Sequence, residues 1–245
     1  MASNAPSACC TRGFKHEGTP SGEIKKIGNI DIYISQPPNN PSPEKAVIIL
    51  SDVLGLYDNC KFVADDFAAR GYLAVAPDLF HGNPLTLNQL EQGNVDIMAW
   101  LKDYTPETVD PIVKETIKHV RETLGVKRVA AAGYCFGAKY VTRFLTEGNI
   151  DVGYVAHPSF VTPEELGAIK GPYAISAAET DTIFPAEKRH QSEEILAKSG
   201  LPYQINLFSG VVHGFAVRGD LSNKVVKFAK EQAFVQAITW FGEHL

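Results

Sequence analysis

The sequence predicts a single α/β domain with a mostly parallel central sheet and helices on both faces. From Ile30 onward, runs typical of strands alternate with segments of helical spacing. Several of the strand runs are continuously apolar, as expected for strands that are covered on both sides. Repeated strand, helix, strand units favour right-handed crossovers between parallel strands, and no internal repeat or linker divides the chain.

Strands are expected at residues 30–35, 46–50, 73–76, 126–132, 152–156, 173–177 and 203–208. Helices are expected at residues 60–70, 87–102, 107–124, 136–145, 185–199 and 225–244. Each helix is bounded by Gly, Pro or a residue suited to capping. In sheets of this type the ligand binds beyond the carboxyl ends of the strands, where the loops converge, so the chemistry is expected at those ends.

Composition places the chain among ordinary globular proteins. It has 245 residues, of which 44% are hydrophobic and 21% charged, unlike a disordered or coiled-coil chain. We expect one domain over 23–245, preceded by an arm over 1–22 that packs on it and is rich in Ser, Pro, Gly and Cys. The 23 Lys and Arg against 28 Asp and Glu give a net charge of −5, so no nucleic-acid partner is expected.

The chain has no apolar stretch of the roughly 18 residues that a membrane span needs, and the first residues lack the pattern of a signal peptide. We therefore expect no membrane partner and a cytoplasmic location, where the four cysteines remain thiols. The adjacent Cys9 and Cys10, with His16 as the only nearby ligand, match no zinc pattern, so no metal is expected. A monomer and a homodimer both stay open.

The segment Gly133-Tyr134-Cys135-Phe136-Gly137 lies between an apolar strand run and a helix-forming stretch. This pattern has the form of a nucleophile elbow, in which small residues two before and two after the nucleophile permit a tight, strained turn. The nucleophile is then Cys135, and a helix N-terminus at this point favours its thiolate. The alternative is a buried cysteine at a glycine-flanked strand end.

An elbow nucleophile needs an acid and a histidine later in the chain, in that order. Asp181 follows the strand run 173–177, and His213 follows the run 203–208. Taken singly, Asp181 could cap a helix and His213 could stack in a loop, but their joint order favours a catalytic role. Glu179 competes with Asp181 for the orienting position, and Asp181 is favoured because it lies nearer the turn.

An oxyanion intermediate needs two N–H donors. The predicted donors are the backbone N–H groups of Phe136, after the nucleophile, and of Val53, in the loop after the strand run 46–50. Asp52 is then placed beside the thiol, although a turn-forming aspartate is nearly as good an interpretation of that residue.

With these residues the sequence resembles the dienelactone hydrolase family of α/β-hydrolases over approximately residues 30–245. The resemblance rests on five features: Asp52-Val53-Leu54-Gly55, Pro77-Asp78-Leu79-Phe80, the elbow, Asp181 and His213-Gly214-Phe215. It implies the α/β-hydrolase fold, a triad of Cys135, His213 and Asp181, and no metal or organic cofactor. In bacterial members a glutamate that gates the thiol looks to occupy the position of Asp52, which is one methylene shorter.

The resemblance also implies a substrate different from dienelactone. Members that act on dienelactone hold its carboxylate with two arginines, at positions where this chain has His81-Gly82-Asn83 and Val217, with Arg218 one place further. We therefore expect a less anionic ester or lactone. The residues expected to line the pocket are Leu54, Phe80, His81, Tyr134, His157, Phe215 and Arg218.

The predicted function is hydrolysis of a small-molecule ester or lactone through a thioester acyl-enzyme. A lyase, isomerase or cyclase of a secondary metabolic pathway, using the same pocket to move a proton or close a ring, is the alternative. A non-catalytic ligand-binding protein on this scaffold ranks last, because such proteins normally lose the triad.

Overall fold

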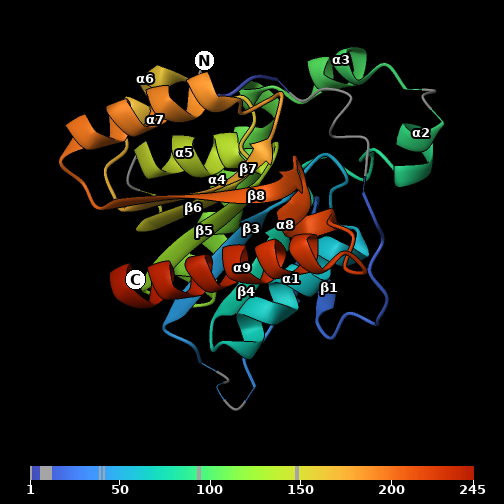
Figure 1. Cartoon of the computed structure of the whole chain (residues 1–245). Helices are drawn as coiled ribbons and strands as arrows, with labels where there is room; N and C mark the ends of the chain where they lie inside the picture. Colours follow the sequence, from blue (N-terminus) through green and yellow to red (C-terminus); the bar gives the residue numbers. More distant parts are fainter. Residues whose placement is uncertain (1, 6–12, 39, 41, 93–94, 147–148) are drawn as a thin grey trace.

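The computed structural model describes residues 2–5, 13–38, 40, 42–92, 95–146 and 149–245. Within these residues eight strands form one sheet, in the order β1-β2-β4-β3-β5-β6-β7-β8 (Figure 1). The strands are Glu23–Ile27 (β1), Ile30–Ser35 (β2), Lys45–Leu50 (β3), Leu73–Pro77 (β4), Arg128–Tyr134 (β5), Val152–Ala156 (β6), Tyr173–Thr180 (β7) and Tyr203–Val212 (β8). β2 pairs antiparallel with β1 and β4, and the other neighbours are parallel.

Helices cover both faces of this sheet, which confirms the predicted fold class (Figure 1). Helices α1 (Asp58–Ala69) and α9 (Lys224–His244) pack on one face, while α4 (Pro106–Lys118) and α5 (Gly137–Thr146) pack on the other. From Ala46 to Leu50, alternate residues of β3 enter the two cores, so this run is apolar in sequence. That two-sided burial explains why the central strands lack a polar alternation.

Each predicted strand is present near its expected position, but several strands differ from the prediction in length. β1 was not predicted, because four of its five residues are exposed and three of those four are charged, so the segment has no apolar run. β5 begins at Arg128 rather than at residue 126, and β7 and β8 run on to Thr180 and Val212. The longer β7 places Glu179 inside a strand, exposed to solvent.

The helix predicted over 87–102 is wrong as one element. The chain instead forms α2 (Leu87–Glu91), α3 (Ile97–Trp100) and a 3₁₀ turn at Leu101–Asp103. A new helix begins after Asp96, because the Asp96 carboxylate accepts the Ala99 N–H at 3.0 Å and so caps the N-terminus of α3.

Other helix boundaries also differ from the prediction. α5 begins at Gly137, because Cys135 and Phe136 form the turn before it. The short helices α6 (Pro163–Gly167) and α8 (Phe215–Arg218) were not predicted, and a π-helical turn, His119–Thr123, follows α4. The remaining long helix, α7, covers Ala186–Ser199.

The N-terminal residues lie across loops at the carboxyl edge of the sheet. Ala2 and Ser3 are buried, and Asn4 N–H donates to the Ile183 carbonyl at 2.7 Å. Further along, Phe14 N–H donates to the Arg218 carbonyl at 3.0 Å. Cys9 and Cys10 lie outside the described residues, and the boundary between arm and domain stays a prediction.

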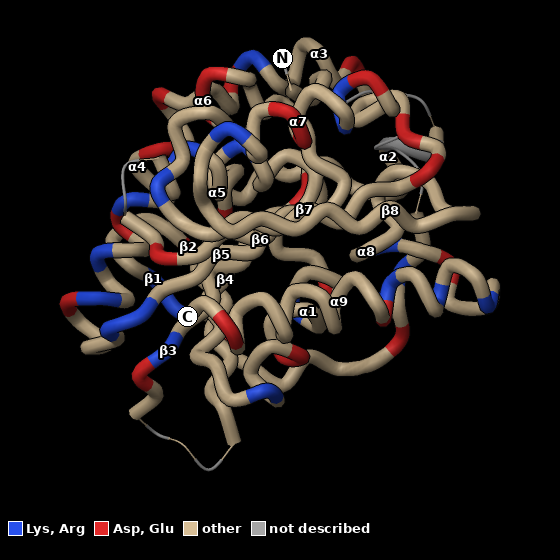
Figure 2. The backbone as a smooth tube through the Cα atoms, turned by 60° about the vertical axis from the view of Figure 1, so that its left-hand side comes forward, with Lys and Arg blue, Asp and Glu red and all other residues tan. Residues whose placement is uncertain are grey.

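Lys and Arg positions alternate with Asp and Glu positions along the helices and loops around the sheet (Figure 2). None of the helices in the described ranges is long and apolar enough to cross a membrane.

Candidate active site

Cys135 occupies a strained turn between β5 and α5. Its φ is +51°, a left-handed conformation that is costly for a residue other than glycine, and the side chain is fully buried. A Cβ at Gly137 would lie 2.1 Å from the Leu50 carbonyl oxygen, and one at Gly133 would lie 2.7 Å from Val141. The two glycines therefore let α5 approach the strand ends closely, as the elbow pattern requires.

His213 and Asp181 meet at the ends of β8 and β7. His213 Nδ1 lies 2.8 Å from Asp181 Oδ2, and both side chains are inaccessible to solvent. The other carboxylate oxygen of Asp181 accepts the N–H groups of Ile183 at 2.8 Å and Phe184 at 3.0 Å. These bonds fix the carboxylate, which in turn fixes the imidazole and directs Nε2 away from the aspartate.

The charge balance of His213 depends on the nearby thiol. Burial alone lowers the pKa of His213, but the Cys135 sulfur and the Asp181 carboxylate outweigh that effect and raise it to about 10. His213 Nε2 is buried and lies on the side of the ring away from Asp181. The raised pKa favours a charged His213 imidazolium at neutral pH.

Two backbone N–H groups are available near the elbow. Within the described chain, the N–H groups of Val53 and Phe136 donate no hydrogen bond. Their loops are joined directly, because Gly137 N–H donates to the Ser51 carbonyl at 3.0 Å. Available N–H groups on two such loops are what an oxyanion intermediate requires.

Asp52 and Arg218 form a buried ion pair. Arg218 Nη1 donates to Asp52 Oδ2, and at most 1% of either side chain is exposed. Leu54 N–H at 3.0 Å and the Tyr57 hydroxyl at 3.3 Å also donate to this carboxylate. Burial raises the pKa of Asp52, Arg218 lowers it, and Cys135 raises it. Asp52 therefore lies close enough to Cys135 for their charges to interact.

Ser159 is a residue that sequence reasoning missed. Its Oγ lies 3.3 Å from Cys135 Sγ, and the side chain is fully buried. The available signal was the turn His157-Pro158-Ser159-Phe160 after β6, because β6 pairs in parallel with β5 through Tyr134 and Ala156. Two neighbouring parallel strands end at the same edge, so their following turns meet.

His157 contacts the imidazole of His213. Their ring centroids are 4.9 Å apart in an edge-to-face arrangement, and the Phe215 ring centroid lies 5.9 Å from that of His157. Burial and the nearby His213 hold the pKa of His157 well below its usual range, so the ring is neutral. Neither ring nitrogen has a hydrogen-bond partner in the described chain. His157 thus belongs to the surroundings of the candidate base.

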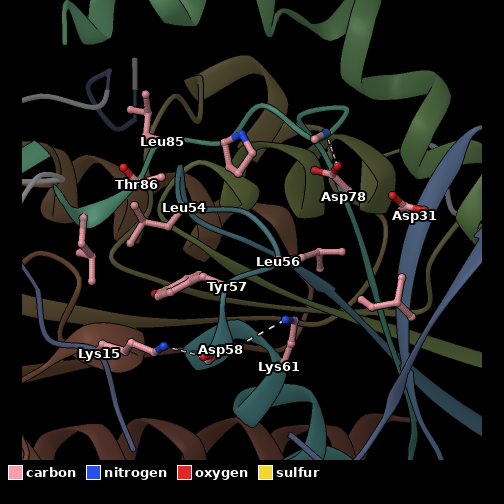
Figure 3. A pocket seen from close by; sticks show the side chains of 14 residues that line it. Lys15, Asp31, Leu54, Leu56, Tyr57, Asp58, Lys61, Asp78, Leu85 and Thr86 are labelled. Atoms are coloured by element: carbon pink, nitrogen blue, oxygen red, sulfur yellow. Dashed lines mark hydrogen bonds and ion pairs between the residues drawn. The ribbon is translucent and has the colours of Figure 1, made fainter. Parts of the chain in front are cut away.

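A cavity of about 580 Å³ opens at the same edge of the sheet, beside the loop that carries Val53 (Figure 3). Its apolar wall includes Leu54, Leu56 and Leu85, and Leu85 N–H donates to the Val53 carbonyl at 3.0 Å. On the helix α1 side, Asp58 lies between two lysines and pairs with Lys15 at 2.9 Å. The cavity thus adjoins the loop of the predicted oxyanion donor, while Cys135, Asp181 and His213 are not among its lining residues.

The predicted pocket residues are distributed differently around this edge. Leu54 lines the cavity, whereas Phe80 is buried against Phe136 with ring centroids 5.2 Å apart. Tyr134 is buried 6.2 Å from the His157 ring. His81 is exposed, with φ +50°, and no contact with Cys135 or His213 is found for it in the described chain. The cavity walls come mostly from residues that the sequence did not single out.

The sheet order, the strained turn after β5, and the acid and histidine at the next strand ends define an α/β-hydrolase. Residues 30–245 match the dienelactone hydrolase family, and the chain belongs to that family. The expected resemblance is thereby confirmed. Family membership makes this chain an enzyme of the ester and lactone hydrolase class.

Similar proteins are found in fungi and bacteria. Hydrolase pyvD of Aspergillus violaceofuscus is 51% identical over 100% of this chain and 99% of its own length. Hydrolase tropI of Talaromyces stipitatus is 48% identical, also over 100% of this chain and 99% of its own. A crystal structure of a putative dienelactone hydrolase from Klebsiella pneumoniae superposes with a TM-score of 0.72 at 17% identity, covering 87% of this chain and 92% of that one.

Proposed function

We propose that this enzyme hydrolyses a carboxylic ester or lactone with Cys135 as nucleophile, His213 as base and Asp181 as the orienting acid. The observation that carries the proposal is the buried 2.8 Å contact between His213 Nδ1 and Asp181 Oδ2 at the edge where Cys135 is held in a strained turn. Glu179 fits the orienting role less well, because its exposed carboxylate accepts the Gly210 N–H at 2.8 Å.

The reaction begins when the Cys135 sulfur attacks the carbonyl carbon and a C–S bond forms. The N–H groups of Val53 and Phe136 hold the negative oxygen of the tetrahedral intermediate. The intermediate then collapses, the C–O bond breaks, and His213 Nε2 gives a proton to the leaving alkoxide. A thioester remains. For a lactone, the released hydroxyl stays attached to the acyl group.

Water completes the cycle. His213 takes a proton from water while the oxygen attacks the thioester carbon, and the second intermediate expels the Cys135 thiolate with the acid as product. Asp181 holds the imidazole in one tautomer and stabilises its charged form in both halves of the reaction.

The ion pair of Arg218 supports a substrate with little negative charge. Because Arg218 pairs with Asp52, it is engaged within the protein rather than directed at a substrate carboxylate. We assign the apolar part of the substrate to the cavity walled by Leu54, Leu56 and Leu85, because it adjoins the loop that carries Val53. Neutral lactones and esters should therefore have higher kcat/KM than anionic lactones.

The first experiment measures a panel of neutral and anionic lactones and p-nitrophenyl esters with the wild type and Cys135→Ala. The wild type should turn over the neutral substrates, the variant should be inactive, and rapid acid quench should trap an acyl group on Cys135. A Cys9→Ser, Cys10→Ser, Cys60→Ser variant should keep its activity. Turnover by Cys135→Ala, or conversion without an acyl-enzyme, would contradict the proposal and favour a lyase, isomerase or cyclase.

The second experiment tests the cavity. Leu56→Phe places a larger side chain in its wall and should lower kcat/KM for esters of long acyl chains while sparing the acetate. Leu207→Phe, at a half-exposed position of β8, is the matched control. Equal effects on acetate and long-chain esters would remove the cavity from the substrate path.

A further inference from the structure

We propose that Ser159 is an additional catalytic residue, whose hydroxyl donates a hydrogen bond to the Cys135 sulfur and stabilises the attacking thiolate. The inference rests on the proposed role of Cys135 as nucleophile. It assigns a function to the turn after β6, which the triad alone leaves unexplained.

The direction of the hydrogen bond follows from the surroundings of Ser159. Its Oγ lies 3.3 Å from Cys135 Sγ, and both side chains are fully buried. Within the described chain the Ser159 hydroxyl has no other hydrogen-bond partner. A hydroxyl is a stronger donor than a thiol, and a buried donor without an acceptor is costly. The hydroxyl therefore donates to sulfur, most strongly when the sulfur is a thiolate.

The backbone holds Ser159 against the elbow from both sides. Ser159 N–H donates to the Cys135 carbonyl at 3.0 Å, and Cys135 N–H donates to the Ala156 carbonyl at 3.2 Å. On either side of Ser159, His157 and Phe160 have φ values of +39° and +61°. Left-handed backbone at non-glycine residues is maintained only where the surrounding structure enforces it, and such strain gathers at functional sites.

The N-terminal residues provide that enforcement. Ser3 N–H donates to the Val161 carbonyl at 2.9 Å, and Ser3 Oγ accepts the Val161 N–H at 2.8 Å. Phe160 N–H donates to the Asn4 carbonyl at 2.8 Å. The turn that carries Ser159 is thus fastened immediately after Ser159, so the hydroxyl has little freedom to leave the sulfur.

Several ionisable groups surround this part of the site, and they come from five different segments. They are His213 after β8, Asp181 after β7, His157 after β6, Asp52 and Tyr57 after β3, and Arg218 in α8. Ser159 differs from all of them because it does not titrate. Removing the Ser159 hydroxyl therefore changes the pKa of the Cys135 thiol without removing a charged group from the site.

The test measures the rate at which iodoacetamide alkylates Cys135 from pH 5 to pH 10, followed on the Cys135 peptide by mass spectrometry. Ser159→Ala should raise the pKa of the Cys135 thiol by about one, because a hydrogen bond to the charged form is lost. A thiolate of higher pKa is also more nucleophilic, so alkylation should be about threefold slower at pH values below both midpoints and about threefold faster on the plateau above them. Ser159→Thr keeps a hydroxyl and should restore the wild-type profile.

Ser51→Ala is the matched control, since Ser51 is buried at the same edge and its hydroxyl has no partner among the described residues. It should leave the profile unchanged. An unchanged midpoint in Ser159→Ala, or a lower plateau with the same midpoint, would overturn the inference. If Ser159→Ala fails to fold, Ser159→Cys decides, because a weak donor of similar shape should give an intermediate midpoint.

Failure of the proposed function has a different signature. If Cys135→Ala retains turnover, Cys135 is not the nucleophile, whatever Ser159 does. If Cys135→Ala is inactive and Ser159→Ala leaves the alkylation profile unchanged, the triad stands and only the role of Ser159 falls.

Discussion

Replacing Arg218 by leucine tests the buried ion pair beside the proposed nucleophile. The change leaves the Asp52 carboxylate with Leu54 N–H at 3.0 Å and the Tyr57 hydroxyl at 3.3 Å as partners. Breaking a buried pair typically costs about 3–5 kcal/mol. The carboxyl can instead bind a proton, which at pH 7 costs about 4 kcal/mol relative to its usual pKa. We therefore expect Arg218→Leu to lower the free energy of unfolding by about 3–4 kcal/mol at pH 7.

The loss should depend on pH in a defined direction. In the variant, folded Asp52 is protonated and unfolded Asp52 is ionised, so the folded state binds one more proton. Acid therefore favours the folded variant, by about 1.4 kcal/mol per pH unit above the usual pKa. Urea unfolding at pH 7 and pH 5.5 should show the deficit relative to wild type shrinking by about 2 kcal/mol.

Arg128→Leu is the control for loss of an arginine. Its side chain is 49% exposed and lies 3.8 Å from Asp151, so the change should cost under about 1 kcal/mol at both pH values. Asp52→Asn combined with Arg218→Leu should be more stable than Arg218→Leu alone, because asparagine needs no proton to become neutral. Two results would refute the ion pair: a loss of unfolding free energy in Arg218→Leu that is equal at both pH values, or a loss in the double variant equal to the sum of the two single losses.

Three further changes test the surrounding site. Asp181→Asn should lower kcat/KM by up to about four orders of magnitude, as for the aspartate of serine proteases, while Glu179→Gln should change it little; steady-state kinetics giving the reverse order would transfer the orienting role. The pKa of His213 is about 10 in the folded protein and 6.5 in the unfolded chain, so its contribution to stability is fully present below pH 6.5 and is lost as the pH rises to 10. In urea unfolding, the free energy of unfolding of His213→Gln should therefore fall less steeply over this pH range than that of the wild type. Equal slopes would contradict this. Ser3→Ala leaves a buried N–H unpaired and should cost about 1–3 kcal/mol in urea unfolding; a loss no larger than that of the exposed Ser209→Ala would speak against it.

Local pattern was sufficient to predict the sheet and the places where Cys135, Asp181 and His213 occur. The central strands appear in the sequence as apolar runs because helices cover both of their faces. The carboxyl ends of parallel strands lie at one edge of the sheet, which indicates where the site residues meet. The elbow is recognisable in the sequence because a Cβ at Gly133 or Gly137 would clash with neighbouring atoms, so both positions require glycine. These features are local in sequence, so a single chain reveals them.

The other features of the site arise from contacts between distant residues. Ser159 reaches Cys135 only through the register that pairs Tyr134 of β5 with Ala156 of β6. Arg218 meets Asp52 across 166 positions of sequence. The edge strand β1 was missed because an exposed strand shows no apolar run, and the broken helix was missed because apolar spacing continues across the cap at Asp96.

The charges around the sulfur explain why neutral groups matter at this site. Asp52 is paired with Arg218, and Asp181 is paired with His213, so each carboxylate already has a cation. A Cys135 thiolate adds one more negative charge in a buried place, where an unpaired charge is costly. Its stabilisation then depends on the charge of protonated His213, which the thiolate shares with Asp181, and on two dipoles, the N-terminus of α5 and the Ser159 hydroxyl. The neutral Ser159 hydroxyl therefore adds to the stabilisation of the thiolate without adding a charge to the site.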